Sequence, residues 1–196
     1  QDLIISHPDS IIAIYGEGGI GKSAFTRHLS SLSDHWIYCS VALFRGESAE
    51  KVIEELASSI AKRFPHVFEK GRPLPGIAIK TLYFFAEIRS DVTLMIDHFE
   101  RLDEEVAGQI LDILFTLNCS KIVISRHAVS QTLQRKYEKK LLLWEFPPFS
   151  IEDTHTFLSH YANGDSLPPE TTSFNEARLL TQACRGNPLK LRAVLS

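Results

Sequence analysis

The feature that most constrains the fold is an eight-residue stretch, GEGGIGKS at residues 16–23, set between an apolar run and a helical pattern. Its spacing fits G-x-x-x-x-G-K-[ST], in which glycines let backbone N–H groups surround phosphate oxygens and the next helix adds its positive N-terminal end. The apolar run SIIAIY at 10–15 supplies the strand that must precede such a loop. The stretch therefore predicts a loop that binds a purine nucleoside triphosphate, with ATP and Mg²⁺ as the best candidates; the alternative is a glycine-rich turn without a ligand.

The residues of this loop have different expected roles. The ammonium group of Lys22 is expected to reach the β- and γ-phosphates, and the hydroxyl of Ser23 is expected to ligate Mg²⁺. The nucleotide-binding set that the motif predicts is Gly16, Gly18, Gly19, Ile20, Gly21, Lys22, Ser23 and Ala24.

Short apolar runs alternate with longer segments of helical period over the first three quarters of the chain. The predicted strands are 10–15, 36–43, 91–96, 120–125 and 140–146. The predicted helices are 22–31, 48–64, 76–89, 103–117 and 128–137, with an exposed connection at 68–76. Strands that alternate with helices form right-handed crossovers and a parallel sheet covered on both faces, so the sequence predicts a three-layer α/β fold.

The strand pattern stops after Pro147-Pro148, and a small helical lobe is expected from there on. The predicted helices are 150–161, 174–184 and 188 onward, separated by a polar loop at 163–173. Ser150 with Asp153, and Asn187 before Pro188, are typical of helix starts. We expect a nucleotide-binding domain at 1–149 and a truncated helical lobe at 150–196. The chain starts almost on a strand and stops inside a helix, which predicts flanking domains in a longer parent protein.

Composition narrows the class of partner. Lys plus Arg is 21 and Asp plus Glu is 24, so the net charge of -3 favours no polyanion, and direct nucleic-acid binding is not expected. The three cysteines are odd in number and far apart, which indicates reduced core thiols and a cytoplasmic protein. No apolar run reaches the roughly 18 residues of a membrane-spanning helix, so no membrane partner is expected.

Two acidic residues follow the third predicted strand. Asp97 ends the apolar run TLMID and is expected to hold the water shell of Mg²⁺ from the strand tip. Glu100 stands three residues later and has two interpretations. It can orient a water for attack on the γ-phosphate as a general base, or it is a solvated acid that opens the next helix.

Arg126 leaves the fourth predicted strand, KIVIS, at its carboxyl end. Ligands of open α/β sheets bind at this edge, where a guanidinium can detect the γ-phosphate. The alternative is an ordinary surface arginine at a strand end.

Four motifs together resemble a known class. GEGGIGKS, LMIDHFERLD, KIVISR and RGNPLKL occur in the order and spacing of the signal-transduction ATPases with numerous domains (STAND), and most resemble the NB-ARC/AP-ATPase group. The resemblance implies a P-loop NTPase fold of the ASCE type with strand order 5-1-4-3-2. It also implies that Pro188, in the motif Gly186-Asn187-Pro188, lies near the base and ribose of the nucleotide.

Two departures from that class affect the expected chemistry. His98 occupies the family's second acidic position, which argues against rapid hydrolysis. The upstream motif that helps to seat the adenine is not visible in QDLIISHPDS at 1–10.

The resemblance implies a regulatory switch: a closed ADP form, exchange for ATP that permits self-association, and slow hydrolysis that resets the state. Its expected partners are the nucleotide, other domains of the parent protein and sister protomers. An AAA+-like working ATPase is the main alternative. A GTPase is less favoured because no N/T-K-x-D motif follows the later strands, and a small-molecule kinase lacks an identifiable arginine-rich lid.

Overall fold

The computed structural model describes residues 9–65, 78–88, 90–164 and 173–195. The stretch before residue 9, the whole of the predicted connection at 68–76, both ends of the helix predicted at 76–89 and most of the polar loop at 163–173 lie outside these residues. A five-stranded sheet has the order β2-β3-β4-β1-β5, which is the predicted order taken from the opposite edge. Its strands are β1 (Ile11–Tyr15), β2 (Trp36–Ser40), β3 (Thr93–Asp97), β4 (Ser120–Ser125) and β5 (Leu141–Glu145).

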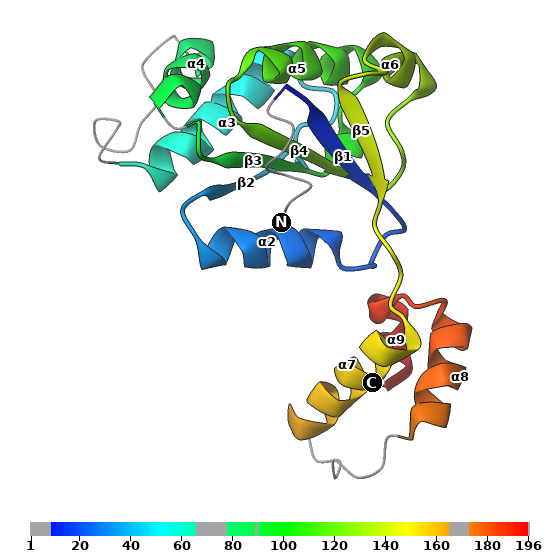
Figure 1. Cartoon of the computed structure of the whole chain (residues 1–196). Coiled ribbons are helices and arrows are strands. Elements are labelled where there is room, and N and C mark those ends of the chain that lie inside the picture. The colour runs from blue at the N-terminus through cyan, green and yellow to red at the C-terminus, as the bar shows by residue number, and fades with distance from the viewer. Residues whose placement is uncertain (1–8, 66–77, 89, 165–172, 196) are drawn as a thin grey trace. The chain divides into compact units, whose positions relative to one another are not determined.

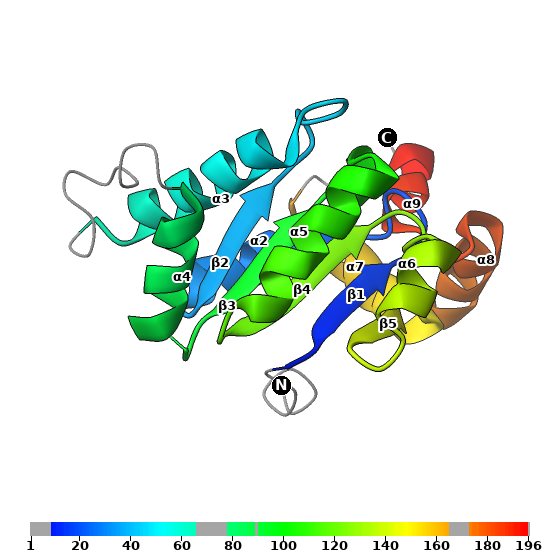
Figure 2. The ribbon, with the colours of Figure 1, turned by 90° about the horizontal axis from the view of Figure 1, so that it is seen from above.

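Helices cover both faces of this sheet. Figure 1 shows α2 on one face and α3, α4, α5 and α6 on the other, and Figure 2 shows α3 and α5 lying along the sheet. Their bounds are α2 (Lys22–Leu32), α3 (Ala49–Arg63), α4 (Ala78–Ile88), α5 (Glu104–Thr116) and α6 (Gln131–Lys136), with a short 3₁₀ helix η2 (Phe99–Arg101). The pairs β1–β4, β2–β3 and β3–β4 are parallel. The predicted three-layer α/β fold is confirmed.

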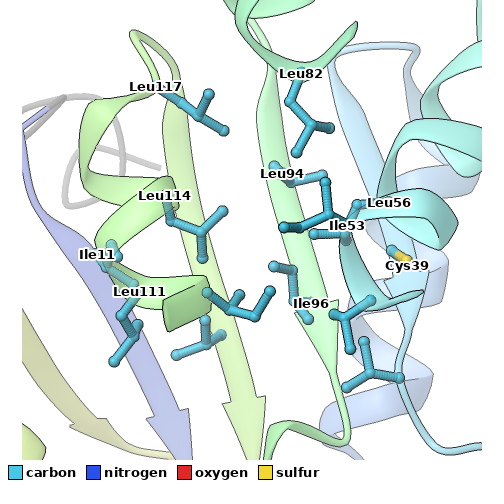
Figure 3. Close-up of a cluster of buried hydrophobic side chains, with 14 of the residues drawn as sticks. Ile11, Cys39, Ile53, Leu56, Leu82, Leu94, Ile96, Leu111, Leu114 and Leu117 are labelled. Carbon is cyan, nitrogen blue, oxygen red and sulfur yellow. The ribbon is translucent and has the colours of Figure 1, made fainter. Parts of the chain in front are cut away.

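The main core lies between the sheet and α3, α4 and α5. Leu94 and Ile96 of β3 lie on the side of the sheet that carries Leu56 of α3 (Figure 3), and Leu111 of α5 belongs to the same cluster. The intervening residue, Met95, is also fully buried and faces the opposite side. Burial on both faces explains why β1, β3 and β4 read as continuous apolar runs.

The three cysteines are buried and free: Cys39, Cys119 and Cys184. Their prediction as core thiols is confirmed. None of the helices within the described residues is both long and apolar enough to cross a membrane.

Two predicted elements extend three residues beyond the observed ones at one end. β2 ends at Ser40, three residues before the predicted end, because its register partner on β3 is Asp97, the last residue of that strand. α6 begins at Gln131 rather than at residue 128, because the Ser130 hydroxyl accepts the Leu133 N–H and caps the helix.

The second part of the fold is the helical lobe, made of α7 (Ile151–Gly164), α8 (Phe174–Cys184) and α9 (Pro188–Leu195). The predicted start of α7 is confirmed: the Ser150 hydroxyl accepts the Asp153 N–H, and the Asp153 carboxylate accepts the Ser150 N–H. The chain divides into two compact units, one of residues 1–15 with 23–144 and one of residues 16–22 with 145–196. The phosphate loop therefore belongs to the same unit as the lobe, and the predicted domain boundary at residue 150 stays a prediction.

Candidate functional site

The predicted phosphate loop, residues 16–23, has a backbone that only glycine adopts readily. Gly19 and Gly21 have φ of 83° and 106°, values at which a side chain would clash with its own backbone. A Cβ built on Gly21 meets nothing within 4 Å, so the loop is open on that side. These two glycines, on either side of Ile20, give the loop the glycine-dependent turns of an anion-binding backbone. Phosphate binding by the loop stays a prediction.

Lys22 is buried at the first position of α2. Its ammonium group donates to the carbonyl oxygen of Gly16 and, at 3.0 Å, to that of Glu17. Two carbonyl oxygens of the loop thus hold the positive charge of Lys22 close to the first residues of the loop. Ser23 follows in the first turn of α2, half-buried, and Ala24 is exposed.

The same loop contacts the start of α9. The Asn187 side chain, 1% exposed, donates from Nδ2 to the Gly18 carbonyl at 3.0 Å. Its Oδ1 accepts the N–H groups of Leu189 and Lys190 at 3.0 and 3.3 Å and so caps the helix, as predicted. One amide therefore joins the phosphate loop to the lobe.

Two further contacts strengthen this junction. Lys190 Nζ lies 2.5 Å from Glu17 Oε1, and hydrogen bonds from Lys190 and then Asn187 lower the pKa of Glu17. A Cβ on Gly19 would come within 2.8 Å of Leu189 Cβ, so the backbone at Gly19 is already in contact with α9. Glu17, Asn187 and Lys190 were missed as site residues, because their partners are far away in sequence.

The motif Gly186-Asn187-Pro188 has a physical explanation within the lobe. Gly186 has φ of 63°, and a Cβ there would lie 2.5 Å from the Phe149 carbonyl oxygen. Phe149 N–H donates to the Gly186 carbonyl at 2.8 Å. Pro188 is the first residue of α9 and is half-buried. Glycine permits the close approach, asparagine bridges to the loop, and proline starts the helix.

Asp97 ends β3 and is 2% exposed. Tyr38 on the neighbouring strand donates its hydroxyl to Asp97 Oδ2 at 2.8 Å, and the His98 N–H donates to Oδ1 at 2.8 Å. Burial, followed by the hydrogen bond and charge of Asp97, raises the pKa of Tyr38, so the phenol stays protonated and donates. The carboxylate is held at the carboxyl edge of the sheet, with lone pairs left on each oxygen for a further donor such as a metal-bound water.

The other neighbours of Asp97 were not predicted. His98 adopts a left-handed conformation, with φ of 65° and ψ of 33°, and its Nδ1 lies 3.1 Å from the Ser40 hydroxyl. Arg27 on α2 lies over the Tyr38 ring, 5.8 Å from its centre. Tyr38 and Ser40 share one face of β2, so the strand order and the two-residue period were the signals that could have identified them.

Glu100 and Arg126 lie together. The Arg126 N–H donates to Glu100 Oε2 at 3.2 Å, and Arg126 Nε lies 3.5 Å from Oε1. The Glu100 side chain is 16% exposed and that of Arg126 is 53% exposed. Glu100 also lines a cavity of about 140 Å³, with Ser125 and His127 among its other walls. Both predicted residues thus meet at the carboxyl end of β4.

Comparison with solved structures identifies the fold. The chain superposes on Cdc6p from Pyrobaculum aerophilum with a TM-score of 0.51 and 16% identity, covering 87% of this chain and 47% of that one. A STAND protein with a tetratricopeptide repeat sensor from Pyrococcus horikoshii gives a TM-score of 0.58 and 15% identity, covering 93% and 26%. Drosophila ORC bound to DNA gives 0.60 and 16%, covering 98% and 58%.

The chain therefore has the fold of the P-loop ATPases, and it spans between about a quarter and three fifths of the length of these three neighbours. No protein-family model matches the sequence. No curated protein matches it either.

Proposed function

We propose that this chain is the ATP- and ADP-binding switch of a STAND-type signalling ATPase of the NB-ARC/AP-ATPase group. ADP holds a closed resting form, exchange for ATP permits self-association, and slow hydrolysis resets the state. The proposal also includes a cytoplasmic location and other domains in the parent protein. The observation that carries it is the bond from Asn187 to Gly18, which joins a loop of phosphate-binding geometry to the helical lobe.

The donor groups of the described residues support a magnesium nucleotide as the ligand. In the proposal, the loop from Gly16 to Ala24 holds the phosphates, Lys22 neutralises the β- and γ-phosphate oxygens, and Pro188 lies against the base and ribose. Ser23 and Asp97 hold the metal ion, which supplies charge neutralisation of the phosphates when bound. The buried Asp97 carboxylate, fixed by Tyr38 and His98, has the oxygen chemistry that Mg²⁺ prefers.

A switch requires that one ligand favours one arrangement. Phosphates bound in the loop would compete with Asn187 for contact with the loop backbone. They would also compete with Glu17 for the positive charge of Lys190. Any displacement of Gly18 or Glu17 acts on α9 directly, because Asn187 and Lys190 stand in its first turn. Nucleotide state and lobe position are therefore linked in this proposal.

An AAA+-like working ATPase is the alternative function. Of the three neighbours, one is a STAND protein, and the other two are Cdc6p and ORC. DNA is bound by the ORC structure; the net charge of -3 does not favour a nucleic-acid surface on this chain. His98, in place of a second acid, supports slow turnover.

The test is calorimetric titration of the chain with ADP, ATP and GTP in Mg²⁺, together with a phosphate-release assay at several protein concentrations. The switch predicts adenine-nucleotide binding, weak or no binding of GTP, and turnover slower than about one per minute, against the ~1–1,000 per second of typical enzymes. Turnover that is fast and rises with protein concentration would favour the working ATPase. Absence of nucleotide binding would overturn both.

A further inference from the structure

Glu100 and Arg126 form a pair whose two halves differ in burial. The Glu100 side chain, which belongs to η2, is largely buried, whereas the guanidinium reaches it from a side chain that is half exposed. Oε1 of Glu100 is a buried atom that accepts no hydrogen bond among the described residues. The 3.5 Å separation from Arg126 Nε brings the charges together without hydrogen-bond geometry. The two side chains therefore form an ion pair that lacks a hydrogen bond between them.

The two oxygens of Glu100 have separate tasks. Oε2 accepts the backbone N–H of Arg126 at 3.2 Å and so fixes the point where the chain leaves β4. Oε1 holds the guanidinium by charge alone. Since the backbone is anchored separately, the Arg126 side chain can leave Glu100 without moving the strand end.

A second acceptor for Arg126 would therefore compete with Glu100. The guanidinium stands at the carboxyl edge of the sheet, where Asp97 also ends its strand and where phosphates bind in the proposed function. A γ-phosphate offers a fork-shaped hydrogen-bonding partner that a 3.5 Å contact to one carboxylate oxygen does not. The cavity of about 140 Å³ beside Glu100 is large enough for water to solvate the carboxylate once the guanidinium leaves.

We propose that Glu100 is a specificity-determining residue, which holds Arg126 in the absence of a γ-phosphate and thereby sets how strongly the site prefers ATP over ADP. This inference rests on the proposed function, and it assigns Glu100 a different task from that of a general base. The energy of the Glu100–Arg126 contact is subtracted from the affinity for ATP but not from that for ADP. Weakening the contact raises the preference for ATP.

The test is a double-mutant cycle on the affinities for ADP and for a non-hydrolysable ATP analogue, measured by titration calorimetry in Mg²⁺. Glu100→Gln removes the charge but retains an acceptor for the Arg126 N–H, so the strand end stays anchored. The ratio of analogue to ADP affinity is expected to rise about two- to fivefold, the range for a partly exposed ion pair. Arg126→Ala is expected to remove the preference for the analogue, and Glu100→Gln is expected to have no effect in that background.

Glu105→Gln is the matched control, because it removes the same charge from an exposed residue of α5 whose side-chain partner is Gln109. Its ratio is expected to equal that of the wild type. If the ratio of analogue to ADP affinity is unchanged in Glu100→Gln, while Arg126→Ala still loses the preference for the analogue, the proposed role of Glu100 is wrong. The proposed switch function would be unaffected by that result. Loss of phosphate release with an unchanged ratio would instead identify Glu100 as the general base. Absence of nucleotide binding in the wild type would remove the proposed function itself.

Discussion

Tyr38 donates its hydroxyl to Asp97 Oδ2 at 2.8 Å across two neighbouring parallel strands. A hydrogen bond to a charged group contributes about 1.5–3 kcal/mol and fixes the direction in which the carboxylate points. The phenol therefore sets the orientation of the residue predicted to hold the metal water shell.

Tyr38→Phe is expected to weaken the Mg²⁺-dependent part of ATP affinity by about 10-fold, as is usual when an outer-shell partner is removed. The measurement is ATP titration in Mg²⁺ and again in EDTA. Tyr83→Phe is the control, because the Tyr83 hydroxyl on α4 accepts a hydrogen bond from Thr116 of α5 and does not contact Asp97. An equal loss with and without Mg²⁺ would mean that Tyr38 only supports the fold.

Lys22→Ala is expected to weaken triphosphate binding about 30- to 5,000-fold, the effect of about 2–5 kcal/mol for truncating one partner of a buried charge pair. Titration with ATP measures it. Lys51→Ala removes the same charge from an exposed ion pair with Glu47 and should bind normally. Wild-type affinity in folded Lys22→Ala would refute the loop assignment.

Gly19→Ala is expected to destabilise the protein more than Gly46→Ala does. Both glycines have positive φ, 83° and 75°, and the conformation itself costs an alanine about 1–2 kcal/mol. A Cβ on Gly46 meets nothing within 4 Å, whereas one on Gly19 meets Leu189 at 2.8 Å. Overpacking adds about 1–3 kcal/mol.

Thermal unfolding measures this difference. Gly46→Ala is expected to lower Tm by about 2–8 °C and Gly19→Ala by roughly twice as much. Equal shifts would show that the loop does not contact α9 in solution.

Asn187→Asp is expected to uncouple the lobe from the loop. Aspartate keeps an oxygen to cap α9 but has no Nδ2 to donate to Gly18. Hydrogen exchange of α9 amides should differ between the ADP and ATP forms of the wild type, and this difference should shrink in Asn187→Asp. Asn118→Ala, at an exposed position after α5, is the control. A difference that persists in Asn187→Asp would dismiss the amide bridge as the link.

The buried thiols predict a loss of stability at high pH. Burial raises the pKa of Cys39 and of Cys119 to about 11. In the unfolded chain a thiol loses its proton at about pH 8.5, so the unfolded state binds fewer protons above that value. The free energy of unfolding therefore falls as pH rises from about 8.5 to about 11, and is unaffected by these groups below it.

The expected fall at pH 10 is about 2 kcal/mol per thiol, measured by urea unfolding at pH 7.5 and 10. A Cys39→Ala/Cys119→Ala variant should show a smaller fall over the same interval. An equal fall would assign the pH dependence to other groups.

Local patterns were sufficient where a strand or helix is bounded by its own residues. β4 and α8 have the predicted bounds, 120–125 and 174–184, because turn residues and the Ser173–Glu176 capping box stand at their ends. β2 was predicted too long because nothing in WIYCSVAL marks Ser40. Its end is set by the length of β3, which is a property of the partner strand.

The residues of the candidate site were likewise predictable only where a local sequence pattern marks them. The loop glycines, Lys22 and Arg126 follow from sequence spacing, and the pairing of Arg126 with Glu100 does not, since it depends on how η2 turns after β3. Asn187 was recognised as a helix cap, which is one of its two roles. Its bond to Gly18 spans 169 residues and leaves no trace in a local window.

The junction between Gly18 and Asn187 also has a consequence for synthesis of the chain. A ribosome adds about 5–20 residues per second, so Gly18 is synthesised roughly 8–34 s before Asn187, which stands 169 residues later. During that interval the glycine loop has its covalent neighbours but not Asn187 or Lys190. The loop and α9 can meet only after residue 187 has been synthesised, so a nascent chain stalled before that residue would carry the phosphate motif without the element that holds it.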